Sequence, residues 1–300
     1  MKTGDKWKEW TVGSLLGQGV YSKVFEIHRV ESGHVDTAAL KELSIPWDKE
    51  EIVKLKKEGV PSELIKEKCY EKLTEKLQKI NWVASMRGQS GTVLIEDYSI
   101  AEKTGDIGWD VYIQMELLTP LNKVLIDRGM MSIDVIKLGT DICRALEQCN
   151  INNTAHGNIN PEKIYISEDG RFKLGGLENS VKACREREDL GRCGARYYAA
   201  PEIVKGEPYS AAADIYSLGL ILYSLLNNMR LPFMPPYPER IRIADKEKAM
   251  MSRMNGERMP YPQNADGKLG EIVLKACEYI PHNRFRSACE MRKALEEVKR

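Results

Sequence analysis

The chain has 300 residues, of which 42% are hydrophobic, and a formal net charge of +1 at pH 7. This length is enough for two lobes with a core each, and the balanced charge gives no bulk attraction to nucleic acid or to a membrane surface. No apolar run reaches the roughly 18–20 residues that a bilayer-spanning helix needs, and the N-terminus has no apolar signal-peptide core. We therefore expect neither membrane insertion nor nucleic-acid binding.

The seven cysteines contain no Cys-x-x-Cys pair, and their number is odd. This usage is typical of reduced thiols, so we expect a cytoplasmic protein. Cys184 and Cys193 fall on one predicted loop, and a redox pair there is the alternative. The other five are Cys69, Cys143, Cys149, Cys277 and Cys289.

The first third of the chain has the pattern of a small β-rich lobe that ends near Glu116. Short runs rich in branched residues lie between glycine turns and predict strands over 10–19, 23–30 and 37–43, and two more over 93–100 and 110–118. Residues 48–79 are dense in Glu and Lys with Leu and Ile between them, broken once at "EGVPSE". This pattern predicts two helices with solvated faces.

The rest of the chain has the pattern of a mainly helical large lobe. Residues 142–149 carry an apolar stripe at i, i+3, i+4 and i+7, and residues 269–277 carry another. Residues 215–226 are apolar nearly all round, which predicts a buried central helix. The proline-rich stretch at 231–240 is either a connector or a ligand for a partner.

Two features point to phosphate binding. "LGQGVYSKV" places Gly17 and Gly19 in a turn whose backbone N–H groups can approach phosphates closely, although a simple hairpin turn has the same look. Further on, "AALK" places Lys41 at the end of a predicted strand, where a lysine is ordinarily just exposed. The combination favours a nucleotide site more than either feature does.

Eight motifs in order resemble those of the eukaryotic-like (Hanks-type) Ser/Thr protein kinases, particularly the bacterial ones. The resemblance covers nearly the whole chain and implies an α+β, bilobal fold: one domain over 1–300, with a small lobe over about 1–116, a hinge over about 116–120 and a large lobe over about 121–300. The motifs are Gly17-x-Gly19-x-x-Ser22-x-Val24, Ala39-Leu40-Lys41, Met115-Glu116-Leu117-Leu118, "HGNINPEKIYI" at the catalytic loop, "KLGGLENS" at the DFG position, Ala200-Pro201-Glu202, Asp214 in "ADIYSLG", and Arg284, expected to pair with Glu202.

The same resemblance implies which residues would contact ATP. Lys41 would pair with the phosphates, and Glu116 and Leu118 would offer backbone groups to adenine beside Met115. Tyr165 is bulky for the floor of such a pocket, so a partly filled pocket is the alternative. The full predicted nucleotide set is Gly17, Gly19, Val24, Ala39, Lys41, Met115, Glu116, Leu118 and Tyr165.

The catalytic loop departs from the family pattern. Asn158 stands where the family has the aspartate that accepts the substrate proton, and a neutral amide is a very poor base. Asn160 replaces the loop lysine, and Gly157 replaces the arginine that follows His156.

Both family metal ligands are absent as well. Lys163 replaces the metal-binding asparagine and Gly176 replaces the DFG aspartate, whereas Mg²⁺ needs oxygen ligands. One unit pair at about 4 Å is worth about 4 kcal/mol at an effective dielectric near 20, so an ammonium beside a divalent ion meets roughly twice that repulsion. Glu178 would supply a ligand only if the loop shifted by one or two residues. We therefore expect no metal site.

Two further positions are altered. The family's helix-C glutamate falls on Lys79, while Glu75, one turn earlier on the same face, is the alternative partner for Lys41. Ala195 stands where the family has a threonine. The structural positions His156, Leu177, Asp214, Glu202 and Arg284 persist.

The sequence therefore predicts a pseudokinase: a binding, scaffold or regulatory module for protein partners of unknown identity, whose ATP, if it binds, binds without Mg²⁺. An active Ser/Thr protein kinase with unusual residues is the alternative. Exposed candidates for partner contact are the Glu/Lys-rich segment, the proline-rich loop and the surface of the large lobe.

Overall fold

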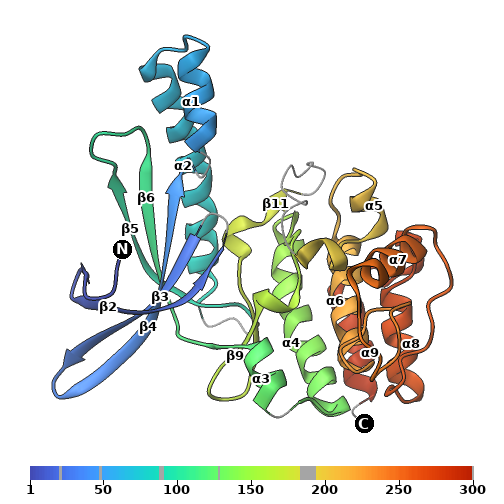
Figure 1. Ribbon diagram of the computed structural model, residues 1–300. Coiled ribbons are helices and arrows are strands. Elements are labelled where there is room, and N and C mark those ends of the chain that lie inside the picture. Colours follow the sequence, from blue (N-terminus) through green and yellow to red (C-terminus); the bar gives the residue numbers. More distant parts are fainter. Residues whose placement is uncertain (20–21, 47–48, 88–90, 128, 183–193, 299–300) are drawn as a thin grey trace. The chain divides into compact units, whose positions relative to one another are not determined.

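A computed structural model describes residues 1–19, 22–46, 49–87, 91–127, 129–182 and 194–298. The chain forms two compact units (Figure 1). The N-terminal unit comprises Met1–Gln89 and Val93–Leu118, and the C-terminal unit comprises Ser90–Thr92 and Thr119–Arg300. The predicted α+β class is confirmed.

A six-stranded antiparallel sheet forms the N-terminal unit, in the order β1-β2-β3-β4-β6-β5. All five predicted strands are present. The short first strand was not predicted. The strands are β1 (Lys6–Trp7), β2 (Trp10–Gln18), β3 (Ser22–Glu31), β4 (His34–Ile45), β5 (Ile95–Glu102) and β6 (Trp109–Met115).

One face of this sheet carries a small core of its own. Phe25 of β3 lies opposite Leu40 of β4, and both pack with Trp7 and Trp10 from the N-terminal segment. The indole N–H of Trp7 donates to Oγ of Ser99 over 2.8 Å, which ties β1 to β5. Two tryptophans three residues apart were the sequence signal for this cover, because aromatic side chains bury large apolar areas.

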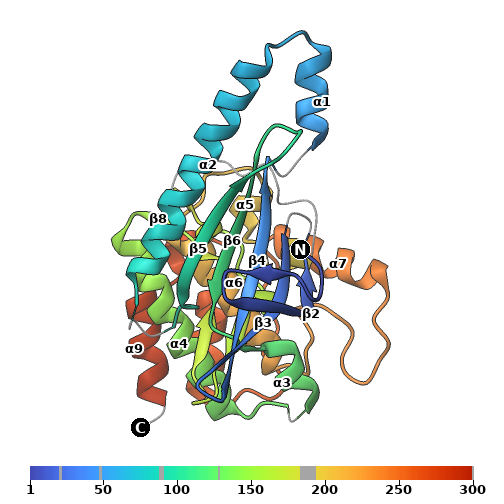
Figure 2. The ribbon, with the colours of Figure 1, turned by 90° about the vertical axis from the view of Figure 1, so that its left-hand side faces the viewer.

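The charged segment folds as the two predicted helices, α1 (Lys49–Lys57) and α2 (Ser62–Ser85). The second helix extends past Lys79, and its buried residues face β4 and β5. Figure 2 shows α1 and the start of α2 projecting beyond the sheet strands. The buried residues of α2 are Ile65, Cys69, Leu73, Ile80 and Val83.

The C-terminal unit is mainly helical, as predicted. The apolar helix α6 is buried over most of its length and packs against α4 and α8. Its helices are α3 (Leu121–Asp127), α4 (Ser132–Ile151), α5 (Pro201–Val204), α6 (Ala211–Leu225), α7 (Ile243–Met254), α8 (Gly267–Ala276) and α9 (Ala288–Val298). None of the helices in the described part of the chain is long and apolar enough to cross a membrane.

Short strands that the sequence did not reveal organise the loops of this unit. They form a sheet in the order β10-β9-β7 and a separate β8–β11 pair. Their bounds are β7 (Thr119–Pro120), β8 (Thr154–Ala155), β9 (Ile164–Ile166), β10 (Phe172–Leu174) and β11 (Val181–Lys182). Strands of two or three residues are too short to show a periodic pattern in a sequence.

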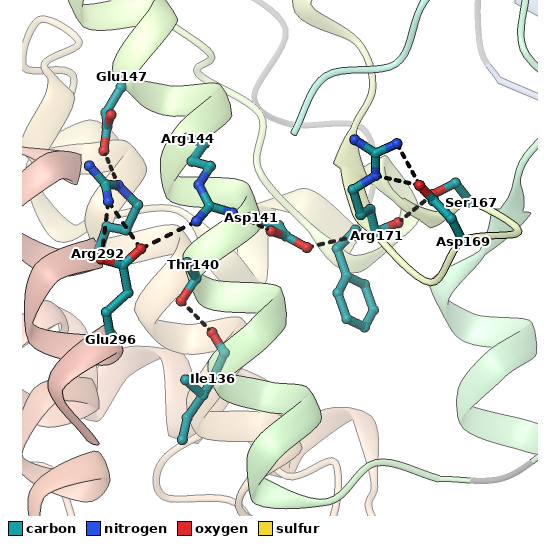
Figure 3. Close-up of polar contacts among 11 residues, drawn as sticks. Ile136, Thr140, Asp141, Arg144, Glu147, Ser167, Asp169, Arg171, Arg292 and Glu296 are labelled. Atoms are coloured by element: carbon teal, nitrogen blue, oxygen red, sulfur yellow. Dashed lines mark hydrogen bonds and ion pairs between the residues drawn. The ribbon is translucent and has the colours of Figure 1, made fainter. Parts of the chain in front are cut away.

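A chain of charged groups links the last helix to these strands (Figure 3). Arg292 of α9 pairs with Glu147 of α4 at 2.7 Å, and Glu296 of α9 pairs with Arg144 at 3.3 Å. Arg144 also pairs with Asp141 at 2.9 Å, and this buried carboxylate accepts the backbone N–H of Phe172 over 3.1 Å. The network holds β10 against α4.

The described cysteines form no disulfide with one another. Cys143, Cys149 and Cys277 are buried, and burial raises the pKa of the Cys277 thiol to about 12. Thiols in apolar surroundings are unreactive because the thiolate is disfavoured. Cys184 and Cys193, the predicted alternative pair, lie outside the described residues.

Candidate functional site

The strand register gathers four predicted nucleotide residues on one face of the N-terminal sheet. Val24 lies directly opposite Lys41, and Ala39 lies directly opposite Met115. Opposed residues share a face, and residues two apart on a strand share it too. Lys41 is not at the end of its strand as predicted: β4 continues to Ile45, because its pairing with β6 runs on to Trp109.

The glycine turn adjoins the same row. Gly17 lies opposite Val24 in the β2–β3 ladder, and the Gly19 N–H donates to the Ser22 carbonyl oxygen over 2.8 Å. Among the described residues other than its two chain neighbours, none has a heavy atom within 4 Å of a Cβ built on Gly17, so these residues leave space for close approach there.

The predicted hinge begins at Glu116, which forms two hydrogen bonds with Leu94. The Glu116 N–H donates to the Leu94 carbonyl oxygen over 3.3 Å, and Oε1 of Glu116 accepts the Leu94 N–H over 2.7 Å. Leu118 is the last residue of the N-terminal unit, and Thr119 begins β7 of the C-terminal unit. The glutamate side chain thus pins the end of β6 to the segment before β5.

On α2, Lys79 and Glu75 form an ion pair with a separation of 3.0 Å. The two residues are one turn apart on one helix face, as the sequence implied. The two residues that the sequence offers for the family's glutamate position therefore form an ion pair with each other.

In the C-terminal unit, the buried carboxylate of Asp214 holds the backbone of the catalytic-loop motif. Its two oxygens accept the N–H groups of His156 at 2.7 Å and Gly157 at 2.9 Å. Gly157 has a φ of +71°, a left-handed conformation that favours glycine over the family's arginine. Nδ1 of His156 accepts the Asn158 N–H over 3.2 Å, so its Nε2–H donates to the Gly175 carbonyl oxygen over 3.0 Å.

Asn160 is a buried structural residue, a role that sequence reasoning missed. Its Oδ1 accepts the Glu162 N–H over 3.0 Å and caps the 3-10 helix η1 (Pro161–Lys163). Its Nδ2 donates to the backbone oxygen and to Oδ1 of Asn158, both at 3.1 Å. The signal was an asparagine directly before a proline, because Asn is favoured at an N-cap and Pro at the first helical position.

Gly176, at the first DFG position, lies against Lys163. It has a φ of +93° and precedes the 3-10 helix η2 (Leu177–Asn179). A Cβ at position 176 would lie 3.5 Å from Cδ of Lys163 and 3.6 Å from Nε2 of His156. The two segments are also joined by the Gly175 N–H, which donates to the Lys163 carbonyl oxygen over 2.8 Å.

The residues after Gly176 point into the unit. Leu177 is 1% exposed, as expected for a packing residue. Glu178 is 4% exposed, and its Oε1 accepts a hydrogen bond from Nδ2 of Asn179 over 3.1 Å. Among the residues that the structure describes, no three His, Cys, Asp or Glu side chains form a group that could hold a metal ion.

The expected buried ion pair forms. Arg284 donates to both carboxylate oxygens of Glu202 at 2.6 and 2.8 Å, and also to three backbone carbonyl oxygens. Its guanidinium stacks 4.7 Å from the ring centre of Tyr216 on α6. Ala195 lies in the 3-10 helix η3 (Gly194–Tyr198), and residues 183–193 before it lie outside the described part.

Comparison with known proteins accounts for this arrangement. Residues 10–296 match the protein kinase domain family, so the chain belongs to that family and has its bilobal α+β fold. It is 27% identical to a probable serine/threonine-protein kinase of Clostridium perfringens over 194 residues, which cover 63% of this chain and 27% of that protein. It is 27% identical over 214 residues to the serine/threonine-protein kinase PknB of Mycobacterium leprae, covering 68% of this chain and 33% of PknB.

A third relative is an Aurora kinase of Eremothecium gossypii, 24% identical over 298 residues, which cover 98% of this chain and 69% of that protein. The chain thus spans about a third or less of the two bacterial relatives. The names of the two bacterial relatives support membership of the Ser/Thr protein kinase family.

Proposed function

We propose that this chain is a pseudokinase: a protein-kinase-fold module that binds, scaffolds or regulates protein partners and has lost efficient phosphoryl transfer. The observation that carries the proposal is the approach of the Lys163 side chain to Gly176, in which Cδ of the lysine lies 3.5 Å from the position that a Cβ at residue 176 would take. These two positions hold the metal ligands in active protein kinases, and here one is a cation and the other has no side chain.

The catalytic-loop geometry supports the same proposal. Asn158 is a neutral amide that accepts a hydrogen bond from Asn160, and neither residue can act as the base or the phosphate-binding cation of an active enzyme. Because phosphoryl transfer depends on positioning and electrostatic stabilisation, losing these groups together removes most of the catalytic effect.

We propose further that ATP, where it binds, binds without Mg²⁺. The row of Val24, Lys41, Ala39 and Met115 on one sheet face supports retention of the nucleotide residues of the N-terminal unit. Tyr165 pairs with Lys173 on β10 and is the candidate floor residue of the C-terminal unit. Protein partners would meet the projecting α1–α2 helices, the 231–240 loop or the C-terminal unit, and we place the protein in a bacterial cytoplasm.

The second candidate is an active or weakly active Ser/Thr protein kinase. The names of the relatives favour it, because they are Ser/Thr kinases. The retained Lys41 and the intact Glu202–Arg284 pair are compatible with it. In an active kinase of this kind, groups other than Asn158, Lys163 and Gly176 would have to supply the base and the metal ligands.

One experiment separates the two candidates. Purified chain is incubated with radiolabelled ATP and a general protein substrate, with Mg²⁺ or Mn²⁺, beside the Lys41→Met variant. The pseudokinase proposal expects label incorporation equal to that of the variant. Incorporation that clearly exceeds the variant would overturn it in favour of the active kinase.

A further inference from the structure

Lys163 occupies the side of Gly176 on which an aspartate would stand. The Cδ atom of the lysine lies 3.5 Å from the Cβ position of residue 176, and the ammonium is two bonds further along. The backbone pairing of Gly175 with Lys163 holds the two residues in register. The stem of the lysine therefore runs past the turn that carries a metal ligand in active relatives.

This arrangement does not fit Mg²⁺. Octahedral Mg²⁺ needs oxygen ligands, and neither Lys163 nor Gly176 has a side-chain oxygen. The next carboxylate along the chain, Glu178, is 4% exposed and accepts a hydrogen bond from Asn179. The φ of +93° at Gly176 also disfavours any side chain that would restore the ligand.

The same arrangement fits an anion. An ammonium carries three N–H donors and requires no coordination geometry, so it pairs with phosphate oxygens as a point charge. A metal-free nucleoside triphosphate keeps the two negative charges that Mg²⁺ would neutralise. A cation close to the phosphates therefore attracts the free nucleotide more strongly than its Mg²⁺ complex.

We propose that the ammonium of Lys163 takes the place of the metal ion, so that Mg²⁺ opposes nucleotide binding to this chain. Occupancy then rises when free Mg²⁺ falls, which is the reverse of the dependence in an active kinase. This inference rests on the proposed metal-free binding of ATP.

The test is a calorimetric titration of the purified chain with ATP, in EDTA and in excess Mg²⁺. Wild type is expected to bind ATP at least about tenfold more weakly in Mg²⁺, the scale of one lost charge interaction. Lys163→Met keeps the apolar stem beside Gly176 but removes the charge, so its affinity in EDTA should fall and the Mg²⁺ effect should disappear. Lys163→Asn is the second variant. Lys268→Met, which changes an exposed side chain of α8, is the matched control and should behave as wild type.

Each outcome has a distinct meaning. Equal affinity in EDTA and Mg²⁺, or an Mg²⁺ effect unchanged in both Lys163 variants, overturns the role of Lys163. Tighter binding in Mg²⁺ overturns the inference and leaves nucleotide binding standing. No heat of binding under either condition overturns the inference together with metal-free ATP binding, whereas the pseudokinase proposal is tested separately by phosphoryl transfer.

Discussion

Two sets of residues in the C-terminal unit differ in what they do: one supports the fold, and the other occupies the positions of the family's chemistry. The supporting set, Asp214, Glu202 and Arg284, keeps buried, fully paired charges that hold backbone and helices in place. The chemical set, Asn158, Lys163 and Gly176, contains no carboxylate, and in the proposed pseudokinase these residues replace the family's base and metal ligands. Removing a buried partner destabilises the fold, whereas replacing a group that faces a ligand need not. Stability of the fold and chemistry at the ligand site therefore depend on different residues.

Arg284→Met tests most directly whether the supporting set stabilises the unit. The substitution leaves the Glu202 carboxylate buried without its cation, so we expect a loss of about 3–5 kcal/mol in the free energy of unfolding. Lys268→Met removes one partner of an exposed ion pair and should cost less than about 1 kcal/mol. Urea unfolding measures both. A small loss for Arg284→Met would show that the supporting set does not stabilise the unit.

Asp214→Asn tests the support beneath the loop. An amide can accept only with its oxygen, so one of the two N–H groups at His156 and Gly157 faces an NH₂ group instead. We expect a loss of about 1–3 kcal/mol, measured by urea unfolding. The exposed Asp266→Asn is the control and should stay within about 0.5 kcal/mol of wild type. Equal values for both variants would contradict a supporting role for Asp214.

Asn160→Ala tests whether Asn160, at the position of the family's loop lysine, stabilises the fold by capping η1. Loss of the cap on η1 should cost about 1 kcal/mol, and Asn160→Ser, which keeps a capping oxygen, should recover much of it. Thermal unfolding of both variants gives the comparison. If alanine and serine are equivalent, the cap does not contribute to stability.

Asn158→Asp is expected to have the smallest effect. The side chain is half-buried, and the change should alter stability by no more than about 0.5 kcal/mol. Phosphoryl transfer should stay at background, because Lys163 and Gly176 still provide no metal ligand. Only the combination with Lys163→Asn and Gly176→Asp would supply both ligands for Mg²⁺. Activity of the single variant in the radiolabel assay would refute the metal argument.

The sequence by itself determined the fold class, the five longer strands of the first sheet, the two charged helices and the buried central helix. The elements follow from local composition, turn residues and apolar patterning, which depend only on neighbours along the chain, and the bilobal fold class followed from the family resemblance. It also determined which motif positions lack carboxylates, and the pairing of Glu202 with Arg284 followed from the family resemblance.

Only the tertiary structure decided the rest. The Trp7–Trp10 cover and the short strands that hold Tyr165 arise from contacts between distant segments. The cap of Asn160 is local and has a sequence signal, but its burial depends on the folded unit. The approach of the Lys163 side chain to Gly176 brings together residues on two separate turns. Periodicity does not encode such pairs, because their geometry is set by the hydrogen bonds at His156 and Gly175 that bring the turns together.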